Sequence, residues 1–116
     1  MMDRLHYAGH SVITGTAIAE ALLDYAQALA QATGSATVQI PTVNDDGTPG
    51  RSEILVGPSS QLISDAEPSE HDEVIDENLV AYLRAEAVSL RTHGVPAGGA
   101  VIPAPPPPRD WSEFDL

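Results

Sequence analysis

The chain has no cysteine, no lysine, and only one tryptophan and one phenylalanine among its 116 residues. The lack of cysteine excludes disulfides, thiolate metal ligands and thiol nucleophiles. No apolar run approaches the roughly 20 residues that a membrane-spanning helix needs. The N-terminal sequence has no basic segment followed by an apolar stretch, so we expect no signal peptide. We therefore expect a protein of the reducing cytoplasm.

Positive charge is scarce as well. Five arginines stand against 17 aspartates and glutamates, which gives a formal net charge of -12. Such a surface repels phosphate backbones and anionic membranes, so direct binding to nucleic acid or to a membrane is not expected. The acidity is typical of a soluble protein, and it also suits a face that binds a basic partner or imitates nucleic acid.

Two segments have the apolar spacing of helices. In the first, Thr14 or Thr16 is expected to cap a helix that begins near Ala17 and is ended by Gly34. Apolar residues recur every three or four positions, and a polar face that includes Asp24 lies opposite them. The predicted buried stripe consists of Ile18, Leu22, Tyr25 and Leu29.

The second helical segment follows Asp76, which is expected to cap it, and Glu77 suits the positive end of the helix dipole. Gly94 and Pro96 are expected to stop this helix. The predicted buried stripe consists of Leu79, Leu83, Ala87 and Leu90, with Val80 and Val88 beside it.

Extended structure is predicted in three places. Residues 5–13 carry apolar side chains around Gly9, which indicates two short extended pieces or one bent strand. Residues 36–40 alternate apolar and polar side chains before Pro41, which cannot donate to a ladder and favours an edge or a bulge. Residues 54–56 follow a turn rich in Asn, Asp and Gly, so these two segments are expected to form a hairpin.

These elements predict the order β-α-β-β-α. The economical packing is an α+β fold, with two helices on one face of a small, mainly antiparallel sheet. We divide the chain into an α+β domain at 1–94 and a Pro/Gly-rich tail at 95–116. The run Pro105, Pro106, Pro107 and Pro108 predicts a stiff polyproline II spacer within that tail.

No catalytic or metal-binding pattern is complete. Residues 42–53 match part of a calcium EF loop, but Thr42 supplies no carboxylate and Pro49 has no backbone N–H, so a hairpin turn is favoured. His6 and His10 lie four apart, yet Gly9 and the extended pattern do not place them on one helical face. We therefore predict that the protein is not an enzyme and carries no cofactor or metal.

Acidic side chains gather at residues 65–77, where their density favours a solvated loop. The alternative is a surface for the arginines and lysines of a partner. That surface would be formed by Glu70, Asp72, Glu73, Asp76 and Glu77.

The tail ends in an aromatic and acidic motif. Trp111 and Phe114 are the largest apolar side chains in the chain, and exposing them to water gains nothing for folding. They either fill a groove on their own domain or, as we favour, dock together with Leu116 onto another protein. A second copy of this chain is one option for that partner.

The sequence thus predicts a non-catalytic interaction module or accessory subunit whose tail binds a protein partner. The alternative hypothesis is an acidic inhibitor or antitoxin-like protein, in which residues 65–77 mask a basic nucleic-acid-binding surface.

Overall fold

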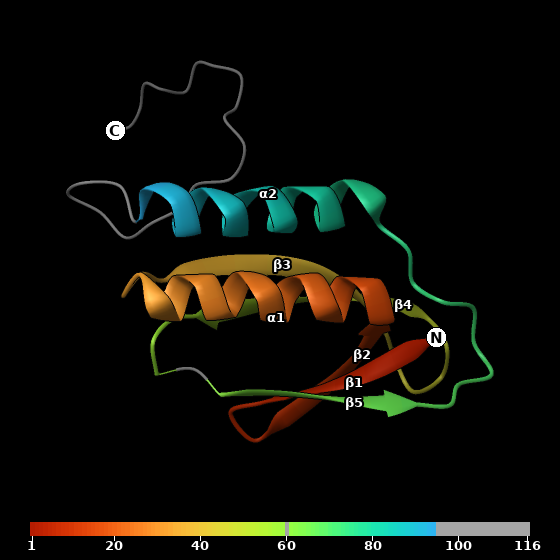
Figure 1. The fold of residues 1–116 in the computed structure, drawn as a ribbon. Coiled ribbons are helices and arrows are strands. Elements are labelled where there is room, and N and C mark those ends of the chain that lie inside the picture. Colours follow the sequence, from red (N-terminus) through yellow and green to blue (C-terminus); the bar gives the residue numbers. More distant parts are fainter. Residues whose placement is uncertain (60, 95–116) are drawn as a thin grey trace, which may run out of the picture.

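The structure is a computed structural model, and it describes residues 1–59 and 61–94. The strands are β1 (Met2–Tyr7), β2 (His10–Gly15), β3 (Ala36–Val43), β4 (Pro49–Val56) and β5 (Leu62–Glu67), and the helices are α1 (Thr16–Gln31) and α2 (Glu77–His93). The strands form one antiparallel sheet in the order β4-β3-β2-β1-β5. Both helices lie on one side of this sheet (Figure 1), which confirms the predicted α+β class.

In residues 1–59 and 61–94, no helix is long and apolar enough to cross a membrane.

The observed element order, β-β-α-β-β-β-α, contains two strands more than the predicted order. Residues 5–13 fall in two strands, β1 and β2, which is the first of the two predicted alternatives, because Ala8 and Gly9 adopt positive φ values of 52° and 84°. A two-residue turn of this kind matches the twist of a hairpin. The second additional strand is β5, which pairs with β1 over its whole length and includes the first residues of the predicted acidic loop.

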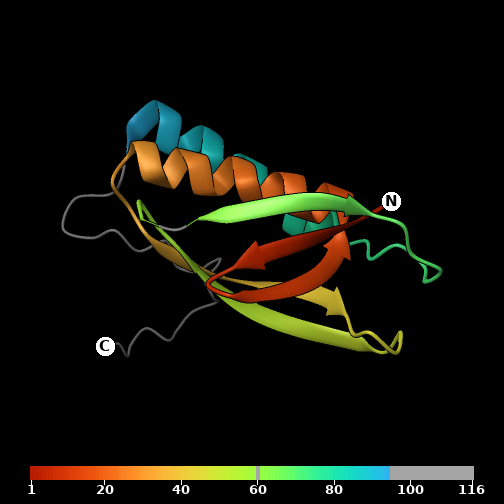
Figure 2. The same ribbon diagram turned by 90° about the horizontal axis from the view of Figure 1, so that it is seen from below.

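The sheet consists of two parts that meet at one point. Strands β2 and β3 share a single bridge, Ile13 to Val43, and Figure 2 shows the β3–β4 hairpin running at an angle to β1, β2 and β5. Next to this bridge, the Thr14 hydroxyl donates to the Pro41 carbonyl oxygen at 2.7 Å. The N–H and C=O of one strand residue point to the same side, so the N–H that Pro41 lacks would also face β2. The predicted edge strand is therefore wrong, because β3 lies between β4 and β2. Proline is tolerated at position 41 because the β2–β3 pairing does not extend to it, while the β3–β4 pairing continues through it.

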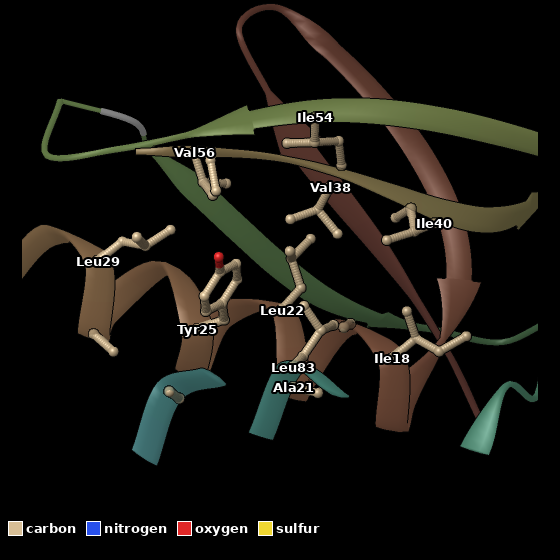
Figure 3. Packing of buried hydrophobic residues seen from close by; sticks show 14 of the residues in the cluster. Ile18, Ala21, Leu22, Tyr25, Leu29, Val38, Ile40, Ile54, Val56 and Leu83 are labelled. Carbon is tan, nitrogen blue, oxygen red and sulfur yellow. The ribbon is translucent and has the colours of Figure 1, made fainter. Parts of the chain in front are cut away.

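The core lies between α1 and the side of the sheet that faces it (Figure 3). The predicted stripe of α1 is confirmed, since its four side chains are at most 1% exposed. On α2, Leu83, Ala87 and Leu90 are buried, while Leu79 and Val80 are partly buried against the same cluster. Val88 is 62% exposed, so its predicted place beside the stripe is wrong.

The start of α1 also differs from prediction. Gly15 is the N-cap residue and supplies no side-chain cap. The hydroxyl of Thr16 instead donates to the buried carboxylate of Asp3 at 2.6 Å, and the hydroxyl of Ser64 donates to the other oxygen of that carboxylate at 2.6 Å. Asp3 therefore connects β1 to α1 and to β5. Thr14 and Thr16 both donate their hydroxyl hydrogen bonds to strand residues, and neither caps the helix.

Ion pairs join the two helices. Asp24, expected on a solvent face, lies 2.8 Å from Arg91 and 3.1 Å from Arg84 of α2. Hydrogen bonding to Arg91, helped by Arg84, lowers the pKa of Asp24 below its usual value. At α2, the predicted cap is confirmed, because the Asp76 carboxylate accepts from the Leu79 backbone N–H at 3.0 Å.

Tyr25 provides a test of the core. Its side chain is 1% exposed, and no residue of the described domain forms a hydrogen bond with its hydroxyl group. A buried hydroxyl without a partner costs about 1–3 kcal/mol. We expect Tyr25→Phe to leave the free energy of unfolding at neutral pH unchanged or to raise it by up to about 1 kcal/mol. The control Tyr7→Phe should lower it by about 1 kcal/mol, because the Tyr7 hydroxyl donates to the Leu55 carbonyl.

The same substitution should alter stability in alkali. Burial raises the pKa of Tyr25 well above its usual value of 10.0. The unfolded chain therefore loses this proton before the folded domain does, so stability falls as the pH rises above about 10. Tyr25→Phe should weaken this fall, measured by denaturant unfolding at neutral pH and above pH 10. An equal fall in both proteins would contradict the burial of the hydroxyl.

Candidate functional site

The predicted docking residues of the tail lie outside the described residues. They are Pro105, Pro106, Pro107, Pro108, Trp111, Phe114 and Leu116. Their role, and the division of the chain at residue 94, stay predictions.

The five acidic residues of the alternative surface have different environments. The carboxylate of Glu73 is 2.6 Å from the N-terminal amino group of Met1, and Asp76 caps α2. Glu70, Asp72 and Glu77 are exposed. Two of the five side chains therefore have a structural role, and three are directed to solvent.

The acidic segment at residues 68–76 is anchored to the end of the sheet. Val74 packs on a small apolar cluster formed by Met2, Ile13 and Val43. The ring of His71 lies over Gly47 in the β3–β4 turn, where an added Cβ atom would be only 2.7 Å from it. The segment thus follows a defined path, although it contains neither helix nor strand.

The two sequence patterns that resemble metal sites both lie in β-hairpins, the His6–His10 pair in β1–β2 and residues 42–53 in β3–β4. His6 lies opposite Ser11 and His10 opposite Tyr7, and neighbouring strand positions point to opposite faces. The two imidazoles therefore lie on opposite faces of the hairpin. In the described residues, no group of three or more histidine or acidic side chains could hold a metal ion.

The residues of the EF-like pattern form the predicted hairpin turn. The Asp46 carboxylate accepts from the Thr48 hydroxyl at 2.6 Å and from the Thr48 backbone N–H at 3.0 Å. These hydrogen bonds lower the pKa of Asp46. Gly47 has a φ of 89°, as the turn requires. The carboxylate is thus bound to its own turn.

The divergence of the two sheet parts leaves a groove that the sequence did not predict. Its first part, the apolar hollow, has a volume of about 260 Å³ and is lined by Leu5, Tyr7, Val12 and Ile54, together with polar residues that include His10 and Glu53. The hydroxyl of Tyr7, one of the lining residues, donates a hydrogen bond to the Leu55 carbonyl of β4. The apolar hollow is therefore bordered by strands that are not neighbours in the sheet.

The second part, the polar hollow, has a volume of about 230 Å³ and adjoins the first, since Ser11, Val12 and Ser52 line both. It also contains Arg4 and Arg51. Arg4 binds Glu67 through Nε at 2.7 Å and Nη2 at 2.6 Å, and this carboxylate raises the pKa of Arg4. Within the described domain, Arg51 is the one arginine without an ion pair.

Comparison with models of known protein families, with curated proteins and with solved structures finds no match for this chain.

Proposed function

We propose that the protein is a non-catalytic interaction module that binds a protein partner through its C-terminal segment, with Trp111 and Phe114 as anchors. The observation that supports this proposal is the composition of the core. Apolar side chains from both helices and from β1, β3 and β4 form one buried cluster, and Tyr25 is its one fully buried aromatic residue among those described. The helices and the sheet thus bury their apolar faces against each other.

The chemistry of the segment supports the same role. Interfaces take most of their binding energy from a few buried side chains, among which tryptophan is enriched. Pro105 to Pro108 restrict the chain before it binds, so less conformational entropy is lost on docking. Leu116 and the neighbouring acidic side chains complete a motif that is both apolar and soluble.

The proposal predicts the effect of removing the anchors. The full chain, immobilised, should capture a defined partner, and the double variant Trp111→Ala, Phe114→Ala should bind that partner about a hundredfold more weakly or worse. The matched control is Ile75→Ala, Val88→Ala, which removes two apolar side chains that are each 62% exposed on the domain. Titration calorimetry of the captured partner measures all three proteins. Equal binding by the anchor variant and the full chain would refute the proposal.

A second candidate function is the acidic inhibitor that masks a basic surface. The exposure of Glu70, Asp72 and Glu77 favours it, because these carboxylates are open to a partner's arginines and lysines. Binding through exposed charges weakens steeply with added salt. A partner that is lost at high salt but binds the anchor variant normally would support this second function instead.

A further inference from the structure

We propose that the groove formed by the apolar and polar hollows binds an acidic peptide with an aromatic side chain, and that its occupant is residues 110–116 of the same molecule. This inference rests on the proposed function, because it gives the same segment a binding place on its own domain when no partner holds it. A partner would then compete with the groove for Trp111 and Phe114.

The apolar hollow offers a place for one aromatic ring. Tyr7 and Val12 belong to one part of the sheet and Ile54 to the other, and the hollow of about 260 Å³ lies between them. It exists because β2 and β3 share a single bridge and then diverge. Apolar surface open to water in a concave site is the usual feature of a binding pocket. Tyr7 and Val12 supply it here, because Leu5 and Ile54 are only 1% and 4% exposed. An aromatic ring is the side chain that removes the most such surface from water.

The polar hollow selects a carboxylate next to that ring. Arg51 has no ion pair within the described domain, although the whole chain has a formal net charge of -12. Arg4 is already neutralised, because Glu67 accepts from its Nε and Nη2 and Ser11 accepts from its Nη1. Asp45 also lines this hollow. One carboxylate on Arg51 therefore fits, whereas a strongly anionic ligand such as a polyphosphate does not.

The C-terminal segment has this combination of side chains. Asp110 directly precedes Trp111, and Asp115 directly follows Phe114. The two hollows share Ser11, Val12 and Ser52, so neighbouring residues of one peptide can enter both. Either aromatic residue thus brings a carboxylate to Arg51 when its ring enters the apolar hollow.

The length of the chain permits binding within one molecule. Residues 95–109 separate the end of the described domain from Asp110, and at about 3.1 Å per residue they span roughly 50 Å. This exceeds the longest extent of the molecule, 44 Å. The β1–β2 turn contributes Ala8 to the lining of the apolar hollow. Figures 1 and 2 both show this turn pointing toward the end of the molecule where α2 finishes. A linker of this kind gives an effective concentration near the millimolar range, which favours the molecule's own segment over a second copy.

The test uses the emission of Trp111 in the full chain, because it is the one tryptophan. Dilute protein should give a blue-shifted emission, protected from acrylamide and independent of concentration. Ser52 lines both hollows. Ser52→Phe places a ring in the space of the segment and should abolish the shift. Arg51→Gln should lower the ratio of bound to free segment by about tenfold, the loss expected for one charge-assisted hydrogen bond.

Two control variants make matched changes away from the groove. Thr37→Phe adds the same ring at an exposed position of β3, and Ala17→Glu changes the net charge as Arg51→Gln does, at an exposed position of α1. Both should keep the blue-shifted emission. A water-like emission in the full chain, or a shift that all four variants retain, would overturn the inference. A shift that appears only as the concentration rises would overturn it in favour of a second copy as the source of the segment.

Failure of this inference and failure of the proposed function give different results. A water-like Trp111 in a protein that still captures a partner through its anchors refutes the groove alone. A groove-bound Trp111 in a protein whose anchor variant binds its partner normally refutes the proposed function alone.

Discussion

Replacement of Gly15 with alanine is expected to lower the free energy of unfolding by about 2–3 kcal/mol, a typical cost for overpacking a tight contact. A Cβ atom at Gly15 would lie 1.9 Å from the carbonyl oxygen of Val74. Gly15 has a φ of -67° and a ψ of 149°, an extended conformation open to any residue. The cost is therefore steric, and its relief requires residues 73 and 74 to move away from the end of the sheet.

Two measurements check this expectation. Denaturant unfolding gives the loss of stability, and a glutamate-specific protease should cut Gly15→Ala faster than the unchanged chain, after Glu70 and Glu73. The control is Gly9→Ala, whose added Cβ has nothing within 4 Å but whose φ is 84°, so that only a conformational cost of about 1 kcal/mol is expected. Equal stability of the two variants, with unchanged cleavage, would show that Val74 does not lie against Gly15.

The periodicity of α1 was sufficient to predict its buried face, because one continuous stripe meets the sheet. The same pattern could not place Asp24. On a wheel of α1 alone it falls among the polar residues, yet Arg84 and Arg91 lie beside it. Only the position of α2 reveals that this polar face is partly an interface between helices.

Strand β5 was missed for a related reason. Its residues do not show clear alternation, since Ile63 is 59% exposed and Ser64 faces the carboxylate of Asp3. Its position is specified instead by partners on β1, most clearly by Arg4, which binds Glu67 through two nitrogen atoms. Contacts across more than sixty positions of sequence are invisible to a local pattern.

The groove was equally beyond local reasoning. Tyr7, Val12 and Ile54 come together only because the β3–β4 hairpin turns away after the Ile13–Val43 bridge. Pro41 indicates an edge or a bulge in the sequence, whereas β3 is an inner strand whose pairing with β2 is limited to one bridge. Arg51 becomes distinctive only when the other described arginines are seen to be paired. The aromatic tail, by contrast, was recognisable from composition alone.

The second large effect is expected at Leu83, which is 0% exposed and belongs to the cluster that joins α2 to α1 and the sheet. Leu83→Ala should lower the free energy of unfolding by about 2–5 kcal/mol, because it removes buried apolar atoms and leaves a cavity. A domain of this size has a total stability of the order of 5–15 kcal/mol, so the variant is expected to be partly unfolded at physiological temperature.

The matched control on the same helix is Val88→Ala. Sequence periodicity placed Val88 beside the buried stripe, whereas its side chain is 62% exposed. Alanine has the higher helix propensity, so this change should alter stability by at most about 0.5 kcal/mol, in the stabilising direction. Urea unfolding of both variants compares them directly. A large loss at Val88 with a small loss at Leu83 would mean that α2 is rotated about its axis, since one helix cannot bury both side chains against the same face of α1.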